Sequence, residues 1–503
     1  MENSKKTLTV ALRTNNRYFS KVYDDRPFLI HEPLFRWKPR KRGWIHYPST
    51  LSDLEPRLAE WYDVSRDGLI YTVYLRKGVK SIFGNDLTAE DIKWSWDRAF
   101  STRGVGRFTG RVAPMRNKDN VSVKDKHVIE FRLDKPNVTF PHFLASKYIP
   151  MLDSTEVRKH TTEDDPWAVE WLSNNHASYG PFIIESYDEK EDIVKYRRNK
   201  DYWCPGLPRI DNLILKGIPS PDDRVAAVRS GEVDVALSLP VDGFRSFKGN
   251  EDLYTMAFPS HDPMMLQMNC KREPFINVLV RRAVCYAVPY EKLKEDIWKE
   301  AARSYKSPFV DVCMGYTEKY FPYYEDPDMA KKLLSEAGIT KDINVNMVIC
   351  GEILAEIKPT AEAIKTALAR IGISIEIEDL NEQGFRGKSF KHDFDLLLDP
   401  HTHQVSDAYY ISLDDYGDEK WGIENMNQYY DPEVFRLQQE CLKATTEGER
   451  VEYVHEMQKV ILEGAPQAYL FQINSLVAAR KEVTGLEWDV NGRMFYQNAI
   501  KIL

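Results

Sequence analysis

The stretch that decides the fold is residues 54–98, LEPRLAEWYDVSRDGLIYTVYLRKGVKSIFGNDLTAEDIKWSWDR. Its centre, residues 69–75, is rich in β-branched and aromatic residues and predicts a strand. A turn should precede this strand at Gly68, because glycine adopts the positive φ that a tight turn needs. Thr88 predicts the N-cap of a helix, and Asp91 adds negative charge to the first turn of that helix, where it is favourable.

The same stretch resembles the extracellular solute-binding proteins of peptide, oligopeptide and nickel ABC importers (family 5). The resemblance rests on LAEWYDVSRDGLIYTVYLRKGVK followed by LTAEDIKWSWDR. It extends to three later segments: SYGPF at 178–182, RNKDYW at 198–203 and PFINVLVRRAVCYA at 274–287. An ordered match of this length is far more specific than a short motif.

The resemblance implies an α/β fold of the periplasmic-binding-protein type (type II, cluster C), bilobed and hinge-connected, with an extra inserted domain. It predicts three parts: lobe I from 1–42, 177–269 and 479–503, an inserted domain II at 43–176, and lobe III at 270–478. Residue patterns support a second α/β lobe independently. An amphipathic helix is predicted over 352–370, and an alternating strand follows at 371–377 with Gly372 near its start. This helix-Gly-strand order is typical of a parallel crossover.

Composition fits a soluble globular protein with a large core: 503 residues, 43% hydrophobic and 29% charged, with a net charge of −8. No basic cluster is large enough to predict nucleic-acid binding. No apolar window reaches the length of a membrane span. The six scattered cysteines form no CxxC pair, and several buried free thiols are expected rather than a disulfide framework.

Candidate ligand contacts lie first in segments that line the cleft in the family. The resemblance implies that Phe19, Asp24 and Asp25 line one wall of the cavity, and that Phe108 lies on a loop that reaches the ligand. His261 and Met264 belong to a segment where relatives place a strand that faces the ligand. The arginine that clamps a carboxylate in the nickel-type branch is replaced by Met151.

The most informative departure from the family is residues 394–412, FDLLLDPHTHQVSDAYYIS. Peptide-binding relatives have a tryptophan and an aspartate here, and the aspartate pairs with the α-ammonium of the peptide. The alignment puts His401 near the tryptophan position and the neutral Gln404 at the aspartate position. Plain peptide recognition through the N-terminal amine is therefore not expected. The candidate contacts of this segment are Asp399, His401, His403, Gln404, Asp407 and Tyr409.

Three interpretations of this polar segment remain open. Its imidazoles can contact the ligand directly, as hydrogen-bond partners or as cations for an acidic ligand. They can ligate a metal, alone or through a chelate. The third interpretation is a hydrogen-bonded loop near the cleft with no ligand role.

An enzyme is not expected, because the chain lacks a GxSxG elbow, a P-loop, a Rossmann glycine fingerprint and HExxH. The alternative functions are a metal-dependent hydrolase that uses His401, His403 and Asp399, and a ligand-sensing module of a larger regulator.

The leading hypothesis is therefore a substrate-binding protein of an ABC importer that closes on its solute by hinge motion. The solute is expected to be peptide-like, opine-like, an oligosaccharide or a metal chelate, with no cofactor and no dedicated metal site. The expected partner is the membrane permease, and the protein is expected to be a monomer. The family implies the periplasm or the extracellular face of the membrane. A secretion signal is expected to have preceded Met1.

Overall fold

The structure is a computed structural model. It describes residues 6–14, 29–40, 45–46, 54–102, 115, 117–145, 149–401, 403, 407–417, 424–444, 446–489 and 493–502.

The chain folds into two compact units, called here unit 1 and unit 2. Unit 1 contains residues 1–239, 246–256 and 477–503, and unit 2 contains residues 240–245 and 257–476. The two long strands β14, Leu253–Met268, and β19, Gln467–Arg480, each contribute residues to both units. The return to the first unit at 476/477 lies close to the predicted boundary at 478/479. The outward crossing at 256/257 comes earlier than the predicted 269/270. Whether 43–176 forms a domain of its own stays a prediction.

The main sheet of unit 1 is built around the first strand of the chain. β1 pairs in parallel with β12 and β13, and β11 and β10 extend the sheet in antiparallel fashion beyond β12. Helix α6, Pro221–Ser230, packs against β1 and β13 and ends at Gly231, whose φ of 81° is the left-handed value that favours glycine. The strands are β1 Thr7–Leu12, β10 Phe182–Asp188, β11 Ile193–Arg198, β12 Asn212–Gly217 and β13 Val235–Ala236.

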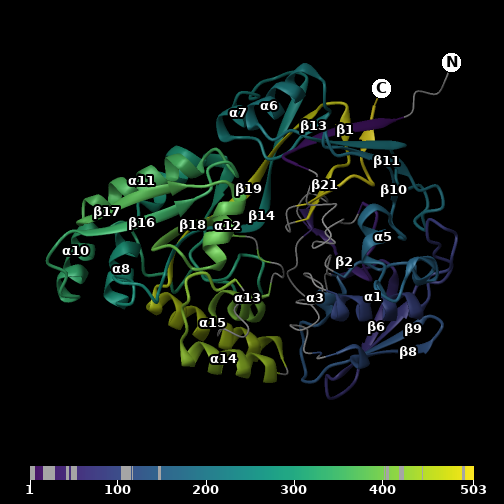
Figure 1. The fold of residues 1–503 in the computed structure, drawn as a ribbon, viewed down its shortest axis with the longest axis horizontal. Coiled ribbons are helices and arrows are strands. Elements are labelled where there is room, and N and C mark those ends of the chain that lie inside the picture. Colours follow the sequence, from purple (N-terminus) through teal and green to yellow (C-terminus); the bar gives the residue numbers. More distant parts are fainter. Residues whose placement is uncertain are drawn as a thin grey trace. The chain divides into compact units, whose positions relative to one another are not determined.

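A second sheet of unit 1 contains the stretch from which the sequence argument started. Its order is β6-β7-β9-β8, all antiparallel. The expected strand is β7, Ile70–Leu75, and Gly68 in the preceding turn has a φ of 69°. The expected helix is α1, Ala89–Ser101, and Thr88 and Asp91 form a capping box at its N-terminus. It packs against β8 and β9 (Figure 1). The other strands are β6 Ala59–Val64, β8 Val121–Asp125 and β9 Val128–Arg132.

The remaining elements of unit 1 are short. The strands are β2 Phe35–Trp37, β3 Pro39–Arg40, β4 Ile45–His46, β5 Leu54–Pro56, β20 Val483–Thr484, β21 Glu487–Asp489, β22 Arg493–Phe495 and β23 Ile500–Lys501. The helices are η3 Lys118–Asn120, α3 Pro141–Leu144, α4 Ser154–Val157, η4 Arg158–His160 and α5 Val169–Asn174.

The strand order that runs through unit 2 is β19-β14-β18-β16-β17. β16, Ile343–Ile349, pairs in parallel with β17, Ile373–Asp379, and with β18, Leu396–Pro400. The connection between β16 and β17 is α11, Ile357–Ala369, which packs on both strands (Figure 1). The predicted helix-Gly-strand crossover is therefore confirmed, although the helix begins at Ile357 and not at the predicted residue 352. The short strand β15, Ala302–Arg303, pairs with β19.

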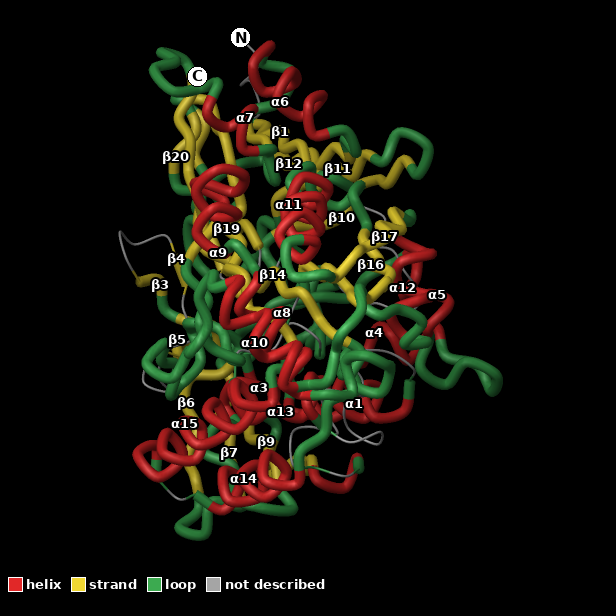
Figure 2. The backbone as a smooth tube through the Cα atoms, turned by 90° about the vertical axis from the view of Figure 1, so that its left-hand side faces the viewer, coloured by secondary structure: helices red, strands yellow, loops and turns green. Residues whose placement is uncertain are grey.

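Helices α14, Pro432–Lys443, and α15, Glu447–Gly464, lie side by side in unit 2 (Figure 2). α14 ends at its C-cap Ala444, and Thr446, whose side chain accepts the Glu449 N–H, caps the start of α15. The other helices are α7 Val241–Arg245, α8 Val278–Ala287, α9 Tyr290–Lys292, η5 Leu293–Trp298, η6 Lys299–Ala301, α10 Pro327–Glu336, α12 Glu382–Phe390 and α13 Ala408–Tyr416.

Two further observations concern the whole of the described chain. None of its helices combines the length and the apolar character that crossing a membrane requires. All six cysteines are free thiols, four of them buried, as the scattered spacing predicted.

Candidate functional site

The candidate site lies where β18 leaves the sheet of unit 2. Leu396, Leu397 and Leu398 are fully buried, so they fix the strand, and Pro400 pairs with Met264 on β14. The chain then continues past His401 and His403 to helix α13. All nine residues of α13 are buried, including the adjacent pair Asp414 and Asp415 near its end.

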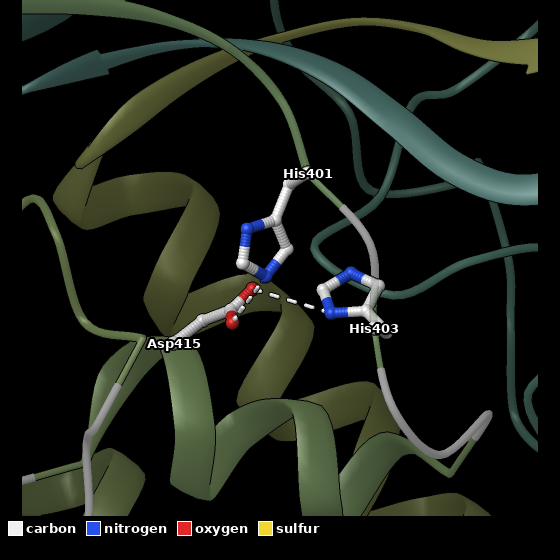
Figure 3. Close-up of side chains that lie close together, drawn as sticks. All are labelled: His401, His403 and Asp415. Carbon is white, nitrogen blue, oxygen red and sulfur yellow. Dashed lines mark ion pairs between the residues drawn. The ribbon is translucent and has the colours of Figure 1, made fainter. Parts of the chain in front are cut away.

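Two histidines and one aspartate converge here (Figure 3). Nε2 of His401 lies 3.3 Å from Oδ1 of Asp415, and Nδ1 of His403 lies 3.8 Å from Oδ2 of the same carboxylate. The two imidazole rings meet edge to face, with 4.7 Å between their centroids. One ligating atom from each residue lies within 4.8 Å of the other two.

Three more carboxyl groups act on this trio. Asp399 Oδ2 is 3.3 Å from Nδ1 of His401, Asp414 is the chain neighbour of Asp415, and Glu424 interacts electrostatically with His401. We call the six residues the carboxylate–histidine cluster: Asp399, His401, His403, Asp414, Asp415 and Glu424. Two buried carboxyl groups, Asp414 and Asp415, and two partly buried ones, Asp399 and Glu424, therefore share this region with two buried imidazoles.

Burial and charge set the protonation of the carboxylate–histidine cluster. Burial disfavours the imidazolium of His401, but the Asp415 and Asp399 carboxylates outweigh it and hold the His401 pKa well above its ordinary value. Burial raises the pKa of the Asp415 carboxyl, an effect that His401 opposes. Burial, together with Glu424 and Asp415, raises the pKa of Asp414 well above its ordinary value. Burial thus drives carboxyl groups of the cluster towards the protonated form, and a bound cation would favour their ionised form instead.

A chain of hydrogen bonds within unit 2 holds the cluster in place. Gln267 on β14 donates Nε2 to Asp399 Oδ2 at 2.9 Å. Asn427 donates to Gln467 on β19 at 3.1 Å, and Gln467 donates to the Tyr416 hydroxyl at 2.9 Å. Tyr416 is the last residue of α13, so strand β19 is connected to the helix that carries Asp415. These contacts fix both sides of the site.

Of the predicted contacts, only part falls in the site. Asp399, His401 and His403 come together as described above. Asp407 instead caps α13 and binds Arg450, and the ring of Tyr409 lies 5.8 Å from the Arg450 guanidinium carbon. Met264 is fully buried in β14, and the described geometry favours a core role for it. For all six of these residues, contact with a ligand stays a prediction.

The structure does not describe the other predicted contacts. Phe19, Asp24, Asp25, Phe108 and Gln404 lie outside the described residues, and so does the side chain of His261.

Sequence reasoning missed Asp414, Asp415 and Glu424. A signal for the first two was present: α13 has the sequence AYYISLDDY, in which two adjacent carboxylates follow an almost wholly uncharged helix. A charged pair in a helix that is buried on every face is expected only where a partner compensates the charge.

Comparison with known proteins places the chain among binding proteins. Residues 53–422 match the family described as bacterial extracellular solute-binding proteins, family 5 middle. Over 440 residues the chain is 25% identical to the Escherichia coli K12 protein named probable D,D-dipeptide-binding periplasmic protein DdpA. The alignment covers 87% of this chain and 83% of DdpA.

Two solved structures resemble the whole chain. One is the periplasmic binding protein AgaA from A. tumefaciens R10 in complex with agropinic acid, with a TM-score of 0.81, 21% identity and 99% of each chain covered. The other is DppA from Helicobacter pylori in complex with the peptide STSA, with a TM-score of 0.81, 20% identity and 99% of each chain covered. This likeness confirms the predicted α/β, type II periplasmic-binding-protein fold.

Proposed function

The chain belongs to family 5 of the bacterial extracellular solute-binding proteins, and we propose that its solute carries a positively charged group. The carboxylate–histidine cluster binds this group. As a member of the family, the chain is a substrate-binding protein of an ABC importer, which confirms the leading hypothesis from the sequence. Proteins of this family work with a membrane permease, in the periplasm or outside the cell. The charge of the solute and the residues that meet it are the proposal.

The observation that carries the proposal is the excess of carboxyl groups in a buried place. Four carboxyl groups meet two imidazoles, and His401 is already paired with Asp399 and Asp415. A buried carboxylate without a compensating cation is costly, so a cationic group of a solute would be bound strongly here. The sequence interpretation in which the imidazoles act as cations for an acidic ligand is disfavoured, since their charge is already matched.

The cluster also answers the difficulty that Gln404 raised. A neutral glutamine cannot offset the ammonium of a peptide-like solute, but Asp399 and Asp415 on either side of His401 can. Amine-bearing peptide-like and opine-like solutes and metal chelates therefore fit the proposal, whereas neutral oligosaccharides do not. The solutes seen in AgaA and DppA, agropinic acid and a peptide, belong to those proteins and at 20–21% identity only illustrate the range that this fold accommodates.

We infer binding without turnover. The hydrolase alternative needed His401, His403 and Asp399 as one set of ligands. Asp399 contacts Nδ1 of His401, whereas Nε2 of the same ring faces Asp415. Asp399 therefore orients the His401 ring through Nδ1, and it does not share a metal-binding position with Nε2 of His401. The family gives no support to catalysis, because its members are solute-binding proteins.

The experiment is a set of thermal melts of metal-free protein against amine-bearing peptides, opines, neutral oligosaccharides and dicarboxylates. A solute at 100 times its Kd stabilises the folded state by about 2.7 kcal/mol, which raises the melting temperature by roughly 5–11 °C for a unit of about 200 residues. We expect such shifts for amine-bearing solutes and none for dicarboxylates.

The matched variants are Asp415→Asn, inside the cluster, and Asp393→Asn, an exposed carboxylate of the same unit with 55% of its side chain accessible. The shift should vanish in the first and persist in the second. A dicarboxylate or neutral sugar that raises the melting temperature equally in both variants would overturn the proposal.

A further inference from the structure

The geometry points to a binding site for one divalent transition-metal ion, formed by His401, His403 and Asp415. This inference deepens the proposed function, since the ion would be the positive group that the carboxylate–histidine cluster binds. The site itself lies wholly in unit 2. It therefore depends on the positions of side chains within that one unit.

The spacing of the three side chains fits a metal site. Nitrogen and oxygen ligands lie about 2.0–2.2 Å from zinc, so two ligands of a tetrahedral ion are about 3.4 Å apart. The His401–Asp415 distance is 3.3 Å and the His403–Asp415 distance is 3.8 Å. All three ligating atoms lie within 4.8 Å of one another, so small side-chain movements bring them to one ion.

The ring of His401 is supported in the manner of a metal ligand. Ligating histidines commonly direct their second ring nitrogen at a carboxylate, which orients the ring and increases its basicity. Asp399 occupies that position at Nδ1 of His401, and Gln267 in turn donates to Asp399 at 2.9 Å. The arrangement leaves Nε2 of His401 directed at Asp415, on the side where the ion would lie (Figure 3).

A second, independent observation comes from hydrogen bonding. Nε2 of His401 and both carboxylate oxygens of Asp415 are buried, and apart from the ion pairs among His401, His403 and Asp415 they have no hydrogen-bond partner in the part of the chain that the structure describes. His401 is 6% exposed and Asp415 is 3% exposed. Buried polar atoms in this state are costly, and a shared cation would satisfy all three at once.

The set of donors selects the class of metal. Two imidazole nitrogens and one carboxylate oxygen suit zinc, nickel and copper, whereas calcium and magnesium prefer oxygen ligands alone. Three protein ligands leave a coordination position for an exogenous donor. The ion therefore binds either as the hydrated ion or as a complex with a small chelator, and the experiment includes both forms.

The test is calorimetric titration of protein that has been stripped with EDTA and dialysed. The probes are Zn²⁺, Ni²⁺ and Mg²⁺ alone, and Ni²⁺ premixed with two equivalents of L-histidine. We expect one Zn²⁺ or Ni²⁺ per chain and no measurable Mg²⁺ binding. Tighter binding of premixed nickel than of the hydrated ion would identify a chelate as the cargo, and the reverse order would identify the bare ion.

Variants assign the residues. His403→Gln and Asp415→Asn should each weaken binding at least 100-fold, and Asp399→Asn, behind His401, by about 10–100-fold. His127→Gln, in the turn between β8 and β9, and Asp393→Asn should bind as the parent does. Circular dichroism checks that each variant is folded. With Co²⁺ as the probe, the parent should show the absorption bands of a low-coordinate ion, and His403→Gln should lose them.

Two outcomes would overturn the inference: no stoichiometric transition metal in the parent protein, or equal affinity in the parent and in His403→Gln. Failure of this inference can be told from failure of the proposed function. If metal-free protein is stabilised by an amine-bearing solute and Asp415→Asn abolishes that effect, the cluster binds an organic cation and the metal inference alone falls.

Discussion

The two ends of helix α13 place an aspartate in very different surroundings. Asp407, at the N-terminal end, accepts two hydrogen bonds from Arg450, at 2.8 and 3.1 Å, and also caps the helix. Asp415, near the C-terminal end, faces two imidazoles at 3.3 and 3.8 Å and has no other partner among the described residues. Both carboxylates are almost fully buried. Burial therefore does not distinguish the aspartate with a structural partner from the one that we propose binds the solute, whereas the partners of the carboxylate oxygens do.

The largest effect is expected at the N-terminal end, from Arg450→Met. It leaves the Asp407 carboxylate buried without its cation, which costs about 3–5 kcal/mol. For a unit of this size that is roughly 2–4 °C in melting temperature for each kcal/mol. Differential scanning calorimetry measures the loss.

The double variant Asp407→Asn/Arg450→Met is the control for this first prediction, because it removes both charges. It should recover much of the lost stability. A loss under about 1 kcal/mol in the single variant would contradict the buried-pair interpretation.

At the other end of α13, Asp415→Asn should separate binding from stability. His401 keeps Asp399 as its partner, so we expect the free energy of unfolding to change by less than about 1 kcal/mol. Affinity for the cationic solute or metal should fall at least 100-fold, or about 2.7 kcal/mol.

The comparison variant for this second prediction is Asp407→Asn, in which stability should fall and affinity should change little per folded molecule. Urea unfolding and calorimetric titration of both variants provide the four numbers. If Asp415→Asn is the less stable of the two, the distinction between the ends of α13 fails.

A smaller effect is expected from the residue that supports the cluster. Gln267→Leu removes the donor to Asp399 and should weaken binding about 10-fold, as loss of an outer-shell partner does at metal sites. The cost in stability should be about 1–3 kcal/mol, because Asn427 also loses a partner at 3.5 Å. Gln267→Glu tests whether a hydrogen-bond donor is needed at this position. It should weaken binding as much as Gln267→Leu does, since a carboxylate cannot donate to Asp399.

Sequence reasoning predicted the scaffold well because its signals are local. The strand at 70–75, the cap at Thr88 and the crossover through Gly372 each depend on neighbours within one element. The division of the chain into three parts stays a prediction. β14 runs from Leu253 to Met268 with no glycine, so nothing in its sequence marks the point at 256/257 where one unit ends.

The candidate site was predicted only in half, for a physical reason. His401 and His403 stand in a segment that departs visibly from the family, so the sequence alone singled them out. Asp415 lies 12 residues beyond His403, and its approach depends on the direction in which α13 leaves the loop. The weight given to Asp407 followed from alignment position. Its partner Arg450 lies 43 residues further along the chain, on α15. Sequence patterns within a single helix or strand cannot predict a contact between residues so far apart.

The smallest effect is expected from Tyr409→Phe, which tests which end of α13 this predicted contact belongs to. Its ring lies over Arg450, on the side of Asp407, and the residue is 6% exposed. Removing the hydroxyl keeps the ring, so stability should change by less than about 1 kcal/mol. Solute affinity should change less than about twofold, or 0.4 kcal/mol, because we propose that the cationic group binds at the other end of the helix. A tenfold loss of affinity with unchanged stability would place Tyr409 in contact with the solute, as the sequence predicted. It would also extend the binding surface along α13 from Asp415 to Asp407.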